Sequence, residues 1–404
     1  MARIVTGLDI GSAQIKCVVA EEKKDGTLSV LAAAKRPSSG LRRAMLVDVE
    51  DATRILREMV VDLQKISKRT VQDVFVNVNG EHIKPRLSRG VVVVSRADQE
   101  IQEDDIERAL GGARAIRLTP NYLVLHNIAR EFLVDDVGDI QSPLGMTGNR
   151  LEVSTLVIEA FSPQVNLLVK TLERVGMRIG GLIYSPIAAA RAVLSKRQKD
   201  LGVLMIDFGF GSTSIAVFEE NKILHAKSLP VGVGHVTNDI AVGLKTSVDA
   251  AEKIKLTYGF ALSKEISRRD SVSLAEFDAT SRGEISKRFI SEIIEIRLAE
   301  ILDLVNNELK SVGRYGELPG GVVITGGGVK TAGMAELVRK ELKLPVQVGF
   351  PDLSRFEILN PAHQEVLDDP EFATSVGLTL WSQEENHKSE RGNGFKKFLR
   401  NLIP

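Results

Sequence analysis

The chain of 404 residues has little cysteine, few aromatic residues and no net charge. Its single cysteine excludes a disulfide framework within the chain and a zinc site built on cysteines. Because 53 Lys and Arg balance 53 Asp and Glu, the basic excess of a nucleic-acid-coating protein is missing. No apolar run reaches the roughly 18 to 20 residues that span a bilayer. The composition predicts a globular protein with about two to four domain-sized cores in a reducing, cytoplasmic setting.

Several catalytic signatures are also missing from the sequence. It has no P-loop lysine motif, no H-E-x-x-H zinc motif and no G-x-S-x-G nucleophile motif. The six histidines are scattered, and we interpret them as surface or hydrogen-bonded residues. These absences exclude the usual sites of P-loop enzymes, zinc proteases and serine hydrolases.

One local pattern occurs twice, about half the chain apart. An apolar strand over residues 3–9 ends at Asp9, and another over residues 202–207 ends at Asp207. Each aspartate stands two residues before a glycine, and a second apolar strand follows each turn. With helical patterns between the strands, this repetition predicts an α/β fold in which one domain is used twice.

The two turns have the composition of phosphate-binding loops. Glycine lets backbone amides approach a phosphate, while hydroxyls and a lysine add donors and positive charge. A carboxylate beside such a loop is consistent with bound Mg²⁺, directly or through water. The alternative is a pair of ordinary tight hairpin turns. The predicted nucleotide ligands are Gly11, Ser12, Ala13, Lys16, Asp207, Gly209, Gly211, Ser212 and Thr213, and the predicted Mg²⁺ ligands are Asp9 and Asp207.

Two further segments have features of a nucleotide site. Gly326, Gly327 and Gly328 follow an apolar strand and leave a flat surface for a base or ribose, although a flexible strand-to-helix turn would use the same residues. Glu252 and Lys255 share one face of a predicted helix. They could bond ribose hydroxyls and phosphate, or form an ordinary surface ion pair.

The end of the sequence has a basic amphipathic pattern. Residues 382–393 are polar and predict a flexible linker, and residues 394–404 place their apolar side chains on one stripe of a helix. So short a helix needs a surface to fold on, which favours a membrane-interface helix over a disordered tail or a helix docked on a protein. The predicted membrane-binding residues are Phe395, Lys396, Lys397, Phe398, Leu399, Arg400, Leu402 and Ile403.

A long helix predicted from Ser286 to Leu309 contains the basic residues Lys287, Arg288 and Arg297. These residues suit an acidic, hydrophobic peptide. Basic residues on a helix are, however, more often its solvated face, so both interpretations stay open.

The three glycine turns, in this order, resemble the phosphate-1, phosphate-2 and adenosine motifs of the actin, Hsp70 and sugar-kinase ATPase superfamily. Asp9, Ser12 and Lys16 match the actin-type first loop, and Glu252 with Lys255 match the A-E-x-I-K helix of bacterial actins. Within the superfamily the chain is most similar to the bacterial FtsA cell-division family.

The FtsA resemblance extends over essentially the whole chain, including residues 127–151 and residues 231–241, which contain the further nucleotide candidate Gly234. It implies a duplicated actin-like, ribonuclease H-like, two-lobe fold with an inserted subdomain and a C-terminal amphipathic helix. The implied parts are 1–82 with 163–200 for the first lobe, 83–162 for the insertion, 201–243 with 321–381 for the lower part of the second lobe, 244–320 for its upper part, 382–393 for the linker and 394–404 for the membrane helix.

The resemblance also implies a function. The family binds ATP and Mg²⁺, assembles head to tail, and tethers the tubulin-like polymer FtsZ to the inner membrane at the division site. The FtsZ C-terminal peptide would dock on residues 244–320, and other division proteins on residues 83–162. The alternatives are another bacterial actin homologue, for pilus assembly or cell shape, and a small-molecule phosphotransferase, for which no substrate-side catalytic residue is identified.

One residue departs from the family pattern. Phe210 stands where family members commonly have a glycine, and it either points away as core or crowds the nucleotide. The departure bears on hydrolysis more than on binding, so the sequence predicts nucleotide binding with at most slow hydrolysis.

Overall fold

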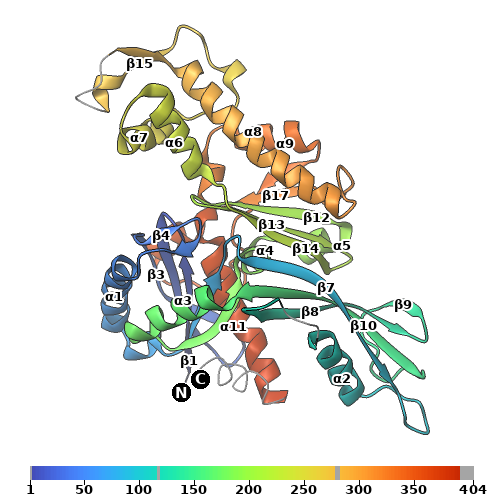
Figure 1. Cartoon of the computed structure of the whole chain (residues 1–404). Helices are drawn as coiled ribbons and strands as arrows, with labels where there is room; N and C mark the ends of the chain where they lie inside the picture. Colours follow the sequence, from blue (N-terminus) through green and yellow to red (C-terminus); the bar gives the residue numbers. More distant parts are fainter. Residues whose placement is uncertain (1, 116–118, 278–282, 392–404) are drawn as a thin grey trace.

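The computed structural model describes residues 2–115, 119–277 and 283–391, with side chains up to residue 383 (Figure 1). Two lobes, each built on its own sheet, are joined by helices, and an inserted subdomain extends from the first lobe. No helix in these ranges is both long enough and apolar enough to cross a membrane.

The first lobe contains a six-stranded sheet in the order β11-β6-β1-β2-β3-β19. Helices α1 and α3 pack together beside it, and α1 begins at the N-cap Asp48, whose side chain accepts from two backbone amides. Its elements are β1 (Arg3–Ile10), β2 (Gln14–Glu22), β3 (Leu28–Pro37), β4 (Leu41–Arg42), β5 (Met45–Leu46), α1 (Val49–Ile66), β6 (Val74–Val78), α3 (Ser162–Arg174), β11 (Ile179–Tyr184), α4 (Ser185–Val193) and β19 (Phe356–Glu357).

The second lobe contains a five-stranded sheet in the order β14-β13-β12-β17-β18. Above it, α6, α7, α8 and α9 surround an apolar core to which α8 contributes Ile290, Ile294, Leu298 and Ile301. Its elements are α5 (Lys196–Leu201), β12 (Val203–Phe208), β13 (Thr213–Glu219), β14 (Lys222–Leu229), α6 (Val233–Leu244), α7 (Val248–Tyr258), β15 (Ser271–Ser273), β16 (Glu284–Ser286), α8 (Lys287–Ser311), β17 (Val322–Thr325), α9 (Met334–Leu342) and β18 (Val346–Val348).

The two sheets repeat one topology. In the first, β1 pairs antiparallel with β2, which pairs antiparallel with β3, while β6 and β11 add in parallel on the other side. In the second, β12, β13 and β14 form the same antiparallel series, and β17 and β18 add in parallel. The prediction of a duplicated α/β unit is therefore confirmed.

The inserted subdomain is a four-stranded sheet in the order β7-β10-β8-β9 with one helix packed on it. It leaves the first lobe directly after β6 and returns at α3. Its elements are β7 (Ile83–Val93), α2 (Glu103–Arg114), β8 (Tyr122–Val134), β9 (Val137–Ile140) and β10 (Arg150–Phe161).

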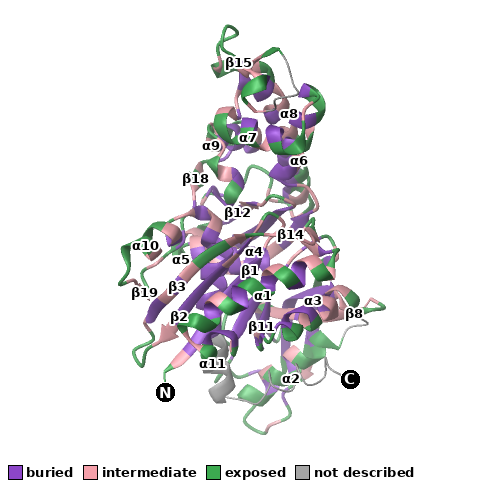
Figure 2. Cartoon of the chain, turned by 90° about the vertical axis from the view of Figure 1, so that its left-hand side faces the viewer, coloured by how far each residue is buried: buried purple, intermediate pink, exposed green. Residues whose placement is uncertain are grey.

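Helix α11 (Ala373–Arg391) packs on α4 and β1, beside the sheet of the first lobe (Figure 1). Two glycines permit these close approaches. A Cβ at Gly7 would lie 2.3 Å from the Ser375 carbonyl oxygen, and a Cβ at Gly377 would lie 1.8 Å from the Ala188 carbonyl oxygen. Figure 2 shows that β1 and α4 are mostly buried.

The structure corrects the placement of the C-terminal elements. Residues 321–381 were predicted to belong to the second lobe, but β19 pairs with β3 of the first lobe, and α10 (Pro361–Leu367) packs on the same strand. The apolar side of α11 also joins a core of the first lobe. Amphipathic spacing shows that a helix has an apolar face, but not which distant sheet covers it.

The linker prediction is corrected as well. The predicted flexible segment 382–393 is helical up to Arg391, because α11 runs on without interruption. The segment is rich in Gln, Glu, Lys and Arg, which favour helices, and residues 382–391 contain no glycine or proline. Residues 394–404, the predicted membrane helix, lie outside the described residues, and that prediction stays untested.

Candidate nucleotide site

The first turn joins β1 to β2 and holds a buried ion pair. The backbone amide of Gly11 donates to the Gln14 carbonyl oxygen at 3.1 Å, which closes the turn. Lys16 Nζ lies 3.1 Å from Asp9 Oδ2, and the two side chains are only 13% and 10% exposed. Asn77, at the end of the neighbouring strand β6, donates to the other Asp9 oxygen at 2.8 Å. Asp9 is therefore fixed from two sides.

The second turn joins β12 to β13 in the same way, with the amide of Gly209 donating to the Ser212 carbonyl oxygen at 3.0 Å. Its aspartate, Asp207, has a weaker partner, the Thr374 hydroxyl at 3.4 Å. Burial and the charge of Asp9 raise the pKa of Asp207 to about 6, although Lys16 opposes this shift.

Lys16 serves both carboxylates. Burial alone would lower its pKa, but the attraction of Asp9 and then of Asp207 outweighs burial and raises it. Lys16 therefore stays protonated at neutral pH. One buried cation faces two carboxylates, which leaves a negative excess that a divalent cation would neutralise.

The two turns meet directly. A Cβ at Gly211 would lie 2.5 Å from Ser12 Oγ, so only a glycine allows this approach. Asn79, which follows β6, donates to the hydroxyl oxygens of Ser214 at 3.1 Å and Ser212 at 3.5 Å in the second lobe. The structure thus brings together the predicted residues of both turns, while Ala13 is exposed at the tip of the first.

The three glycines after β17 have different roles. Gly326 has φ +86°, and a Cβ there would lie 2.1 Å from Asp207 Oδ1. A Cβ at Gly328 would lie 2.6 Å from Val233 and 2.7 Å from Phe208. A Cβ at Gly327 would meet nothing closer than 3.6 Å, so among the three only this residue presents an open surface.

Glu252 and Lys255 on α7 form an ion pair of 2.7 Å, but it is not an ordinary surface pair. Lys255 is 8% exposed and donates to the Thr237 hydroxyl at 2.9 Å. Thr237 in turn donates to the Glu252 carboxylate. Burial lowers the pKa of Lys255 despite its partner. The pair is locked in one arrangement between α6 and α7.

Phe210 lies beside these residues. A Cβ at Gly234 would lie 2.7 Å from a ring carbon of Phe210, and Lys255 Nζ lies 5.5 Å from the ring centroid. The side chain is 38% exposed, so it is not core. Of the two interpretations, crowding of the predicted nucleotide residues fits this position better.

The residues present fit a phosphate and a cation. Thr213 Oγ1 and Gln14 Oε1, one in each turn, are buried without a hydrogen-bond partner among the described residues. A hydroxyl in this position can donate to a phosphate oxygen. The described residues contain no group of three or more potential metal ligands. A cation held by Asp9 and Asp207 would therefore take its other ligands from phosphate and water, as Mg²⁺ usually does.

The predicted peptide-binding residues lie on α8 and are all engaged. Lys287 Nζ lies 4.5 Å from the ring centroid of Tyr258, and Arg288 pairs with Glu292. Arg297 bonds Asp239 at 2.5 and 3.0 Å and Glu300 at 2.6 Å. Beside it lies a groove of about 180 Å³, lined by Asp239, Ile293, Ile296, Arg297 and Glu300.

Several residues of this site were not predicted from the sequence. Asn77 fixes Asp9, and Asn79 joins the two lobes through its hydrogen bond to Ser214. Thr237 orders the Glu252–Lys255 pair. A signal for the asparagines was present, because Asn77 interrupts an apolar strand and Asn79 stands directly before a glycine. Nothing local marks Thr237, since its role depends on the packing of α6 on α7.

Two family models match the chain. One is described as "Cell division protein FtsA" and matches residues 204–377, and the other, "SHS2 domain inserted in FTSA", matches residues 80–159. The second match covers most of the inserted four-stranded subdomain.

Full-length relatives and solved structures agree with these matches. The FtsA proteins of Pseudomonas aeruginosa and Bacillus subtilis are 31% and 32% identical to the chain. The first alignment covers 95% of this chain and 90% of the relative, and the second 97% and 86%. A PilM–PilN type IV pilus biogenesis complex matches with TM-score 0.67 at 20% identity, covering 94% of this chain and 98% of the matched chain. MreB5 of Spiroplasma citri bound to ADP matches with TM-score 0.58 at 13% identity, covering 96% and 99%.

At such identities the solved structures show the fold alone, and it is the actin-like ATPase fold that the glycine turns predicted. The curated relatives exceed 30% identity over most of their length. The chain belongs to the FtsA family of bacterial cell-division proteins.

Proposed function

We propose that the chain binds ATP with Mg²⁺ between its two turns and uses the nucleotide as a switch for head-to-tail assembly. The observation that carries this proposal is the pair of matched turns, whose aspartates share one buried lysine. Backbone amides and hydroxyls of both turns would hold the phosphates, and Mg²⁺ would offset the two carboxylates. Gly327, Glu252 and Lys255 would contact the nucleoside.

Hydrolysis in this proposal is slow. Phe210 stands beside Gly234 and Lys255, where a glycine would leave room for the nucleotide to settle. Binding and assembly then depend on nucleotide occupancy rather than on rapid turnover. Measuring phosphate release by the purified protein checks this part, and fast turnover would contradict it.

The assembled chain would tether FtsZ filaments to the cytoplasmic face of the inner membrane at the division site, through residues 394–404. A single short amphipathic helix binds weakly, but many helices on one polymer bind firmly because the effective concentration is high. Assembly therefore turns a weak anchor into a stable tether.

The groove between α6 and α8 is the proposed site of the FtsZ C-terminal peptide. Ile296 is 62% exposed there and offers an apolar contact. The Arg297 guanidinium, now shared by Asp239 and Glu300, could exchange one of them for a peptide carboxylate. The inserted subdomain is left free for other division proteins.

The membrane proposal is tested by co-sedimentation with anionic liposomes in the presence of ATP. We expect deletion of residues 394–404, or Phe398→Glu, to release the protein from the pellet. Phe350→Glu is the matched control, because Phe350 is 56% exposed on the second lobe. If the deletion and Phe398→Glu both pellet as the wild type does, the membrane anchor is refuted.

The FtsZ site is tested by titrating a fluorescent FtsZ C-terminal peptide. We expect Ile296→Ser and Arg297→Ala each to weaken binding about tenfold, as buried apolar and arginine contacts usually do. Leu304→Ser is the control for Ile296, because Leu304 is exposed on the same helix but does not line the groove. Equal effects of Ile296→Ser and Leu304→Ser would rule out the groove.

A further inference from the structure

A strained two-residue turn lies against both phosphate-loop candidates. Strands β4 and β5 form a short hairpin, with Leu41 paired to Leu46 and Arg42 to Met45. The turn residues Arg43 and Ala44 both have left-handed backbones, with φ +50° and +60°. Hairpins usually build this turn from asparagine and glycine, which adopt the conformation easily. Here an arginine and an alanine adopt it, so other contacts must hold the turn in place.

Those contacts come from both lobes. The Ala44 amide donates to Ser12 Oγ of the first turn at 2.9 Å. A Cβ at Gly211 of the second turn would lie 3.1 Å from the Arg43 amide nitrogen. The hairpin tip, the first turn and the second turn therefore meet at one point.

The contact with Ala44 also sets the direction of the Ser12 hydroxyl. Because Ser12 Oγ accepts the Ala44 amide, the hydroxyl proton is left to donate elsewhere. An acceptor placed beside Ser12, such as a phosphate oxygen, would receive it. The hairpin thus prepares Ser12 as a donor toward the same point that the tip faces.

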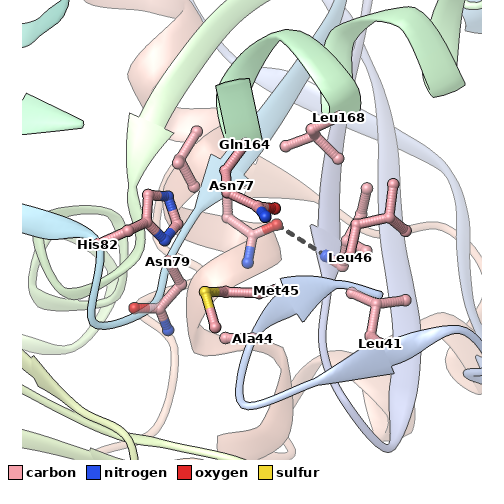
Figure 3. A pocket seen from close by; sticks show the side chains of 11 residues that line it. Leu41, Ala44, Met45, Leu46, Asn77, Asn79, His82, Gln164 and Leu168 are labelled. Carbon is pink, nitrogen blue, oxygen red and sulfur yellow. Dashed lines mark hydrogen bonds between the residues drawn. The ribbon is translucent and has the colours of Figure 1, made fainter. Parts of the chain in front are cut away.

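The underside of the hairpin is apolar and anchored. Figure 3 shows Leu41, Met45 and Leu46 turned toward a small cavity, whose opposite side is formed by Asn77, His82 and Leu168. The cavity measures about 30 Å³, which is room for about one water molecule and too little for a ligand. The side chains facing it hold the hairpin on the first lobe.

The tip, in contrast, presents a cation. Arg43 is exposed, and in the part of the chain that the structure describes no hydrogen bond or ion pair engages its guanidinium. The tip contacts Ser12 and Gly211, which belong to the two predicted phosphate loops. This places Arg43 at the phosphate end of the site.

We infer that the β4–β5 hairpin is a phosphate-binding element and that Arg43 binds the terminal phosphate of a nucleoside triphosphate. The inference rests on the nucleotide binding proposed above and adds a residue and a selectivity to it. A guanidinium matches a phosphate with paired hydrogen bonds, and a diphosphate lacks the group that Arg43 would hold. The strained turn fixes the arginine where the two lobes touch.

The test compares ATP with ADP, each titrated with Mg²⁺ against the full chain by calorimetry. We expect Arg43→Ala to weaken ATP binding about tenfold and to change ADP binding by less than about twofold. Arg42→Ala is the matched control, because Arg42 is exposed on the same hairpin one residue earlier, and we expect it to leave both affinities unchanged. Arg43→Lys should restore part of the preference for ATP.

Ala44→Gly is the control for folding of the turn, because glycine adopts this backbone conformation without strain. This variant should keep the preference for ATP. Adding Arg43→Ala to that variant should remove the preference while the thermal midpoint stays at the level of Ala44→Gly. An equal loss of ATP and ADP binding, or no loss, would overturn the role of Arg43 and leave nucleotide binding intact. Wild-type protein that binds neither nucleotide would overturn the proposed function itself.

Discussion

The two halves of the chain carry the same turn with different electrostatics. In the first half, Asp9 has Lys16 at 3.1 Å and Asn77 at 2.8 Å. In the second half, the hydrogen-bond partner of Asp207 among the described residues is the Thr374 hydroxyl at 3.4 Å, and the pKa of Asp207 is raised to about 6 by burial and by Asp9. The backbone geometry of the turn was duplicated, but the cation was not.

The difference shows how a duplicated fold can build one asymmetric site. The first turn is complete, because its carboxylate is already neutralised by a lysine on the next strand. The second turn has a half-buried carboxylate in an unfavourable setting, and in the proposed function a cation arriving with the ligand would relieve it. If Mg²⁺ binds as proposed, the second half would therefore gain more from it than the first half would.

Removal of Lys16 should produce the largest effect, because Lys16 is the cation that distinguishes the first turn from the second. Lys16→Ala leaves the buried carboxylate of Asp9 and the half-buried carboxylate of Asp207 without their shared cation. We expect a loss of about 3 to 5 kcal/mol in the free energy of unfolding and about a hundredfold loss in ATP affinity. Chemical denaturation and nucleotide titration measure the two effects.

Lys35→Ala is the control for that experiment. Lys35 lies directly opposite Lys16 on β3, but its side chain is 44% exposed and its partner Glu371 is 3.4 Å away. We expect almost no change in stability or affinity for this variant. A similar loss in both variants would mean that the position of Lys16 between the two aspartates is unimportant.

The aspartates should respond to neutralisation with opposite signs. At pH 8, without nucleotide or Mg²⁺, Asp9→Asn removes the partner of Lys16 and should destabilise the fold by about 1 to 3 kcal/mol. Asp207→Asn removes a charge that burial and Asp9 disfavour, and should stabilise the fold by up to about 3 kcal/mol. Urea denaturation measures both changes.

The pH dependence of Asp207→Asn has a defined direction. The pKa of Asp207 is raised from 3.8 to about 6 in the folded chain, so wild-type stability from this group falls as the pH rises through that window. The variant does not titrate there. Its advantage should be full above about pH 6 and should disappear near pH 4. A variant advantage that grows as the pH falls would contradict the environment described for Asp207.

The sequence predicted the features that depend on short stretches of chain. The strand, the glycine turn and the aspartate at the strand end were readable, because each is encoded within about ten residues. Their recurrence half the chain later indicated the α/β duplication. That the two turns meet in space was expected from the family resemblance rather than from the residues alone. The site residues themselves stay predictions until ligand binding is measured.

The features that the sequence did not predict depend on long-range packing. Asn77 reaches Asp9 from a strand that follows a whole helix, and α11 returns to the first lobe from the end of the chain. The strain at Arg43 and Ala44 was also hidden, because neither residue signals a left-handed turn. Each feature appears only when segments far apart in sequence are in contact.

The smallest effect should come from a single hydroxyl in the second turn. Thr213 Oγ1 is buried and has no hydrogen-bond partner among the described residues, whereas Thr6 in β1 donates to the Thr70 carbonyl oxygen at 2.6 Å. We expect Thr213→Val to leave stability unchanged or to raise it by up to about 1 kcal/mol, since it removes an unsatisfied polar group. Thr6→Val, the matched control, should cost about 1 kcal/mol or more.

The same substitution should weaken ATP binding about threefold to tenfold, because a phosphate oxygen would be the missing partner of Thr213. Thr213→Ser keeps the hydroxyl and should retain wild-type affinity, which separates hydrogen bonding from packing. If Thr213→Val destabilises the fold as much as Thr6→Val does and leaves ATP affinity intact, the Thr213 hydroxyl has a structural partner within the protein. The second turn would then hold phosphate through its backbone amides and Ser212, without the Thr213 hydroxyl.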